Sequence, residues 1–317
     1  MTAAAAPVWL DLDQAALDAA YTQSAFAPNM AEVLQRYASS SDAARAVVGE
    51  PQRLAYGPAD MEQLDIYRCR QADAPVVVFI HGGAWRSGRA RDYAFGAPLL
   101  VQAGAHLVVP DFSAVQDVQG DLTPMADQVQ RAVAWVYRHA ASFGADARRI
   151  HLLGHSSGAH LSAVALTTDW QADFGVPADV VKSALCCSGL YDLAPVRLSV
   201  RSSYVAFTDA MEAALSPQRH LGCITAPVMV AYGTRETPEF QRQAKDFAAA
   251  LAASGHRLEL MVGDGLNHFE IIETLAQADG VVGRALLAQL GLPPARTSVE
   301  RGFLDQTARQ RSVLKHS

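Results

Sequence analysis

The chain has 317 residues and a formal net charge of −6; 50% of its residues are hydrophobic and 18% are charged. This composition supports a large apolar core and excludes wholesale disorder. The negative net charge argues against a dedicated nucleic-acid surface, so we expect no nucleic-acid partner.

Neither the beginning of the chain nor any later stretch indicates export or membrane insertion. Residues 1–7 lack the basic region and the long apolar run of a signal peptide. No stretch approaches the roughly 18 consecutive apolar residues of a membrane span. The four cysteines form no Cys-x-x-Cys pair, and we expect buried free thiols. We therefore expect a cytoplasmic protein without a membrane partner.

Residues 1–50 form a first unit of the expected organisation. From residue 11 to residue 48 the sequence is rich in alanine, with apolar residues at helical spacing. This pattern predicts a helical N-terminal extension that lies over the rest of the chain. Its large apolar side chains are Tyr21, Phe26, Met30, Val33, Leu34 and Tyr37.

Residues 51–292 form a second unit, in which expected strands and helices alternate. We expect strands over residues 53–56, 63–68, 76–80, 105–109, 150–153, 183–187, 228–232 and 258–262. We expect helices over residues 93–102, 124–143, 159–167, 238–254 and 269–290. Such alternation predicts an α/β fold with a mostly parallel sheet covered by helices on both faces. Cys186 and Cys187 are adjacent in one expected strand and should point to opposite faces.

Two stretches interrupt this alternation. Residues 190–222 are long for a connector, and we expect them to form a cap over the active site. Residues 293–317 are polar, and we expect either a loosely held tail or an arm that joins two copies in a homodimer.

The most informative stretch is Gly154-His155-Ser156-Ser157-Gly158, which fits the pattern G-x-S-x-G. An apolar strand precedes it and a helix of small apolar residues follows. A strand, a tight turn and a helix form the nucleophile elbow, in which a serine stands at the tip of a strained turn. Glycines two residues before and after the serine remove side chains that would collide there.

Four features resemble, in their chain order, the α/β-hydrolase superfamily over roughly residues 53–292: the stretches at 81–85 and 154–158, an acid after a late strand and a late histidine. Within it, the stretches at 81–85 (His-Gly-Gly-Ala-Trp) and 154–161 resemble the kynurenine formamidase branch and hormone-sensitive-lipase-type esterases alike. Three further stretches favour the formamidase branch: 188–193, 237–243 and 268–270.

The resemblance implies a serine nucleophile, an acid and a histidine base, in that chain order. Ser156 is the expected nucleophile, and it needs a base because a free hydroxyl attacks poorly near neutral pH. His268 is the expected base, since it stands in a glycine-rich loop after the last strand. Glu236 occupies the position where related hydrolases usually carry aspartate. Two alternatives stay open: Asp192 is the acid, or Glu236 only caps the helix that begins near Pro238.

The remaining expected site residues bind the substrate. Backbone N–H groups of Gly83, Ala84 and Ser157 should form the oxyanion hole. We expect four aromatic residues to form the walls of the pocket: Trp85, Tyr204, Phe207 and Phe269. One of five arginines could pair with a substrate carboxylate, although an arginine in such a position is more often a solvated surface residue: Arg86, Arg89, Arg91, Arg197 and Arg201.

We expect no metal and no organic cofactor. His151 and His155 have the spacing of a metal-binding pair, but no third ligand accompanies them. The resemblance implies hydrolysis of an aryl formamide, such as N-formyl-kynurenine, to kynurenine and formate. The alternatives are a carboxylesterase or arylamidase of broader range on the same residues, and an inactive hydrolase fold that serves as a binding module.

Overall fold

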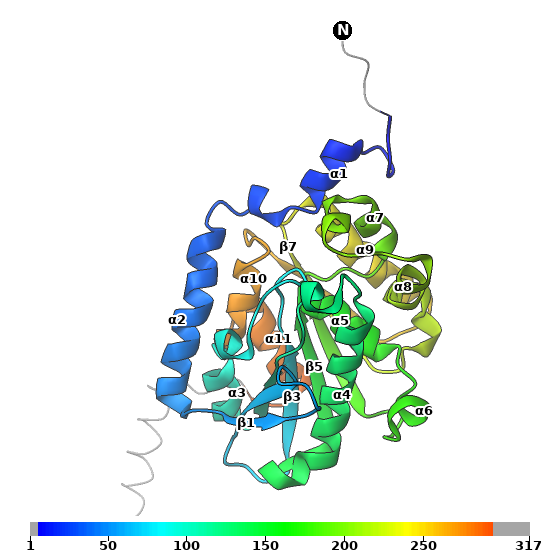
Figure 1. Ribbon diagram of the computed structural model, residues 1–317. Coiled ribbons are helices and arrows are strands. Elements are labelled where there is room, and N and C mark those ends of the chain that lie inside the picture. The colour runs from blue at the N-terminus through cyan, green and yellow to red at the C-terminus, as the bar shows by residue number, and fades with distance from the viewer. Residues whose placement is uncertain (1–5, 294–317) are drawn as a thin grey trace, which may run out of the picture.

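The computed structural model describes residues 6–293 and contains one eight-stranded sheet (Figure 1). The strands are β1 (Gln52–Ala55), β2 (Gln63–Tyr67), β3 (Ala74–Ile80), β4 (His106–Pro110), β5 (Ala145–His155), β6 (Val181–Cys187), β7 (Val228–Gly233) and β8 (Leu258–Gly263). Their order across the sheet is β1-β2-β4-β3-β5-β6-β7-β8. Only the pairs β1–β2 and β2–β4 are antiparallel, so the expected mostly parallel sheet is confirmed.

Helices cover both faces of this sheet (Figure 1). They are α1 (Gln14–Ala20), α2 (Met30–Val48), α3 (Ala97–Ala103), α4 (Thr123–His139), α5 (Ser157–Leu166), α6 (Trp170–Phe174), α7 (Leu193–Leu198), α8 (Asp209–Ala214), α9 (Pro238–Ala253), α10 (Glu270–Glu273) and α11 (Val281–Gln289). Apolar side chains of α4, α5 and α9 belong to the core on one face, and those of α2, α3 and α11 to the core on the other.

The central strands are apolar throughout because both of their faces are buried. In β3, Val76 and Val78 belong to one core cluster, whereas Val77 and Phe79 belong to the other. Cys186 and Cys187 also divide between the two clusters, as their adjacency in a strand predicts. The expectation of buried thiols is wrong for Cys223, which is exposed.

Two expected helices differ from the observed ones. The helix expected over 93–102 begins at Ala97, because Pro98 suits a first helical turn. The helix expected over 269–290 is divided into α10 and α11. A turn separates the two, in which the Gly280 N–H donates to the Gln277 carbonyl at 3.1 Å. A Cβ at position 280 would lie 2.3 Å from the Thr274 carbonyl oxygen, so the break depends on glycine.

The N-terminal helices lie against segments that come late in the chain. The Tyr21 hydroxyl donates to Glu239 of α9 at 3.0 Å. Arg36 of α2 forms an ion pair with Glu273 of α10 at 2.7 Å. The Tyr37 hydroxyl donates to the Phe269 carbonyl at 2.6 Å. The extension is therefore fastened across the edge of the sheet from which residues 233–238 and 264–269 emerge.

Residues 190–222 contain α7, α8 and short 3₁₀ turns, and they lie beside α1 and α9 (Figure 1). The expected C-terminal tail falls almost wholly outside the described residues. In residues 6–293, no helix is both long enough and apolar enough to cross a membrane.

Candidate active site

Ser156 stands at the tip of the turn between β5 and α5, with φ +56° and ψ −123°. Few residues other than glycine adopt such a positive φ, so the turn is strained. The flanking glycines are required by contact: a Cβ at Gly154 would lie 2.4 Å from Ser162 Oγ, and one at Gly158 would lie 2.1 Å from the Ile80 carbonyl oxygen. The backbone thus holds the Ser156 hydroxyl away from the sheet, at the mouth of a pocket.

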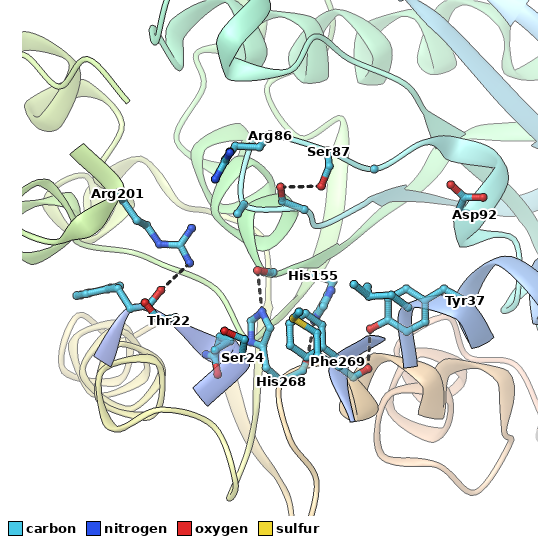
Figure 2. A pocket seen from close by; sticks show the side chains of 18 of the residues that line it. Thr22, Ser24, Tyr37, Arg86, Ser87, Asp92, His155, Arg201, His268 and Phe269 are labelled. Atoms are coloured by element: carbon cyan, nitrogen blue, oxygen red, sulfur yellow. Dashed lines mark hydrogen bonds between the residues drawn. The ribbon is translucent and has the colours of Figure 1, made fainter. Parts of the chain in front are cut away.

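Two side chains from loops after later strands form a hydrogen-bonded series with this serine. Ser156 Oγ lies 2.8 Å from His268 Nε2, and the imidazole faces into the pocket (Figure 2). His268 Nδ1 lies 2.9 Å from Glu236 Oε2. The three side chains are almost fully buried. The carboxyl ends of parallel strands meet at one edge of a sheet, which is why residues after β5, β7 and β8 converge.

The Glu236 carboxylate is held by two donors besides His268. Ser188 Oγ donates to Glu236 Oε1 at 2.6 Å, and the Gly233 N–H donates to the same oxygen at 2.7 Å. Ser188 follows β6 and has a φ of +57°. Ser188 was not among the residues expected at the site. The signal that could have identified Ser188 is a polar residue at the end of β6. This strand pairs with β7, which precedes the expected acid Glu236.

The two open alternatives for the acid have different partners. Asp192 caps α7 by accepting from the Ala194 N–H at 3.1 Å, and it lies 3.7 Å from Arg219. Thr237, rather than Glu236, caps α9. Glu236 therefore contacts His268, whereas Asp192 caps α7.

The loop that follows β3 lies across the pocket from His268. Its residues Gly83, Ala84 and Trp85 have φ values of +124°, +55° and +61°. A Cβ at Gly83 would lie 2.1 Å from the Ser87 carbonyl oxygen, so the tight turn needs glycine there. Within residues 6–293, no acceptor takes a hydrogen bond from the N–H groups of Gly83, Ala84 or Ser157. These donors remain available to a ligand.

The other histidines near the serine are structural partners. His155 Nε2 donates to the His268 carbonyl at 2.8 Å. Burial, followed by the nearby His268, lowers the pKa of His155 to about 3, so this imidazole stays neutral. His160 accepts from Trp85 Nε1 at 3.3 Å and donates to the Leu215 carbonyl at 2.8 Å.

His151 does not join His155 in a metal site. Its Nδ1 lies 2.6 Å from Ser183 Oγ on the neighbouring strand. Among the residues that the structure describes, no group of three or more potential ligands could hold a metal ion.

Ser156 opens into a cavity of about 610 Å³. Tyr204 and Phe269 line it as expected, but Trp85 and Phe207 do not. Trp85 is only 1% exposed and packs edge-on against His160, because its N–H needs a buried acceptor. Phe207 packs against the core instead. A further wall of the cavity, which the sequence did not predict, comes from the N-terminal segment: Tyr21, Thr22, Gln23, Ser24, Met30, Leu34, Tyr37 and Ala38.

Comparisons with known proteins agree with this architecture. A family profile described as BD-FAE matches residues 64–185. The structure of a candidate thioesterase from Silicibacter sp. superposes with a TM-score of 0.75 and 24% identity, over 87% of this chain and 98% of that one. Esterase LipW from Mycobacterium marinum superposes with a TM-score of 0.66 and 19% identity, over 86% of this chain and 90% of that one. The chain therefore belongs to the α/β-hydrolase fold class.

Individual relatives narrow this class. Kynurenine formamidase from Danio rerio is 29% identical over 296 residues, which cover 89% of this chain and 98% of the relative. Isoprenylcysteine alpha-carbonyl methylesterase ICME from Arabidopsis thaliana is 26% identical over 268 residues, which cover 77% of this chain and 60% of the relative. The chain is accordingly a hydrolase of amide or ester bonds, and its expected resemblance to the formamidase branch is confirmed.

Proposed function

We propose that the chain is a serine hydrolase in which Ser156, His268 and Glu236 act as a catalytic triad. The observation that carries this proposal is the 2.8 Å separation between Ser156 Oγ and His268 Nε2. At this distance His268 can accept the hydroxyl proton while Ser156 attacks a carbonyl carbon. Glu236 accepts from His268 Nδ1, which fixes the tautomer with a free Nε2 and stabilises the imidazolium that forms.

The proposed oxyanion hole consists of the N–H groups of Gly83, Ala84 and Ser157. Their lack of acceptors within residues 6–293 and the position of Gly83 and Ala84 on the pocket wall support this role. Removing one such donor typically lowers kcat by roughly 100-fold to 1000-fold. After the attack, His268 gives its proton to the leaving amine or alcohol, and water then releases the acyl group from Ser156.

The proposed substrate is an aryl formamide, with N-formyl-kynurenine as the principal candidate. The similarity to fish kynurenine formamidases over 89% of this chain supports the choice. The aromatic side chains of Tyr37, Tyr204 and Phe269 on the pocket wall suit an aryl leaving group. The products would be kynurenine and formate, and the proposed mechanism uses groups of the chain together with water.

A second candidate function keeps the same residues and takes esters. The similarity to ICME and to the esterase LipQ of Mycobacterium tuberculosis favours it. In this case the pocket would accept an alcohol leaving group in place of the aryl amine.

Turnover of N-formyl-kynurenine and of 4-nitrophenyl acetate by the full chain separates the two candidates. We expect the formamide to have the larger kcat/KM, and turnover of the ester alone would refute the formamidase proposal. Labelling with a fluorophosphonate tests the triad itself. We expect labelling at Ser156, none after Ser156→Ala, and no labelling of folded wild-type protein if the chain is only a binding module.

A further inference from the structure

Arg201 is a buried cation that has no carboxylate partner within residues 6–293. It belongs to the cap and is 7% exposed. Among residues 6–293, its hydrogen-bond acceptors are the Tyr204 hydroxyl, 2.7 Å from one Nη, and the Tyr21 carbonyl, 3.2 Å from the other. Its Nε is buried and has no partner there. Buried arginines are normally paired with an anion, because an unpaired charge is costly to remove from water.

Aromatic rings hold this guanidinium in place without neutralising it. Arg201 Cζ lies 5.5 Å from the centre of the Trp85 ring and 5.8 Å from that of Phe240. Such contacts stabilise a cation while leaving its N–H groups free to bind a ligand. Trp85, expected as a pocket wall, thus lies behind the arginine that reaches the pocket.

Arg201 opens onto the same cavity as the reacting serine. It lines the cavity together with Ser156 and His268, and its guanidinium points toward the interior (Figure 2). Phe240 connects the two regions, since its ring also lies 4.9 Å from the His268 ring. A second cation, Arg86, lines the cavity and stacks on Tyr204, with its Cζ 4.7 Å from the ring centre.

We propose that Arg201 binds the carboxylate of the substrate's leaving group and so selects aryl formamides that carry an amino-acid side chain. This inference rests on the proposed formamidase function for the identity of the substrate. The guanidinium has five N–H donors, of which the protein uses two in the described residues. A carboxylate would accept from the donors that remain and would neutralise the buried charge.

The test compares two ligands that differ only in the carboxylate. Kynuramine is kynurenine without its carboxylate, and calorimetric titration gives the dissociation constants of both without needing turnover. We expect the wild-type chain to bind L-kynurenine more tightly than kynuramine. The ratio of the kynuramine dissociation constant to the L-kynurenine dissociation constant should fall roughly 10-fold to 100-fold in Arg201→Met, as loss of a charged hydrogen bond in a buried site implies. The ratio for Arg201→Lys should lie between those of the wild type and Arg201→Met.

Arg197→Met is the matched control, because Arg197 also belongs to the cap but is paired with Asp209 and Glu212. We expect it to keep the wild-type ratio. Urea unfolding shows whether Arg201→Met is folded. An unchanged ratio in folded Arg201→Met, or equal binding of the two ligands by the wild type, would overturn the assignment.

Failure of the proposed function gives a different result. A wild-type chain that binds L-kynurenine through Arg201 but does not hydrolyse N-formyl-kynurenine would refute the formamidase proposal and leave the carboxylate site standing. Hydrolysis with no dependence on Arg201 would do the reverse.

Discussion

Replacing Glu236 with glutamine tests the acid of the proposed triad with little change in shape. Glu236 Oε1 accepts from the Gly233 N–H at 2.7 Å and from Ser188 Oγ at 2.6 Å. Because the Gly233 N–H cannot turn away, the glutamine should place its carbonyl oxygen there. Its NH₂ group then faces His268 Nδ1 and must donate to it. The imidazole would be held with its proton on Nε2, where it cannot accept the proton of Ser156.

The expected loss is about 10⁴-fold in kcat, the effect of the wrong histidine tautomer in a serine triad, or about 5 kcal/mol of transition-state stabilisation. The opposite amide orientation would set the glutamine NH₂ against the Gly233 N–H, and this buried clash of two donors disfavours it. The free energy of unfolding should change far less than the activation free energy.

Initial rates with 4-nitrophenyl acetate and urea unfolding measure the two quantities. Asp192→Asn is the control, because Asp192 caps α7 and does not contact His268. We expect it to keep kcat within about 10-fold of the wild type, since asparagine caps a helix about as well as aspartate does. Glu236→Gln with more than about a tenth of wild-type kcat would refute the assignment. A large loss confined to Asp192→Asn would transfer the role of the acid to that residue.

Three further substitutions test separate parts of the structure. Ser188→Ala removes a donor to Glu236, so kcat for 4-nitrophenyl acetate should fall roughly 10-fold to 100-fold. His151→Gln removes an imidazole whose pKa burial lowers to about 4. The His151 imidazole therefore binds a proton more readily in the unfolded chain than in the folded one. Between pH 7 and pH 5 this difference should lower the free energy of unfolding of the wild type by about 2 kcal/mol, and urea unfolding of the variant should lack this loss. Gly158→Ala sets a Cβ 2.1 Å from the Ile80 carbonyl oxygen, so fluorophosphonate labelling of Ser156 should be lost.

Each substitution has a control of the same residue type. Ser216→Ala alters a buried serine that caps α7 and should keep kcat near the wild-type value. His139→Gln alters an exposed histidine and should keep the wild-type pH dependence of unfolding. Gly222→Ala meets no atom within 4 Å and should leave labelling intact. A control that behaves like its test variant would refute the prediction made for that variant.

Local patterns in the sequence predict most of the sheet and the turn that carries Ser156. An unbroken apolar run such as residues 76–80 is typical of a strand buried on both faces, and its burial in β3 follows directly. Ser156, Glu236 and His268 each follow an expected strand. In a parallel sheet that position alone sends all three to one edge, even though 112 residues separate the serine from the histidine.

Contacts between distant segments were not predictable in the same way. An aromatic residue beside the oxyanion loop suggests a pocket wall, yet Trp85 turns inward because His160 offers an acceptor for its N–H. Helical spacing shows that residues 30–48 form a helix but not which surface it covers. The contact of Tyr37 with Phe269 spans 232 residues, and no local pattern encodes it.

That contact has a consequence for how the protein is made. The N-terminal segment leaves the ribosome first, but its partners Glu239, Phe269 and Glu273 are among the last described residues to be synthesised. One wall of the cavity therefore has nothing to close against until residues 239–273 have been synthesised. Nascent chains that stop before this point should lack a closed binding cavity, so hydrolysis would report synthesis beyond these residues.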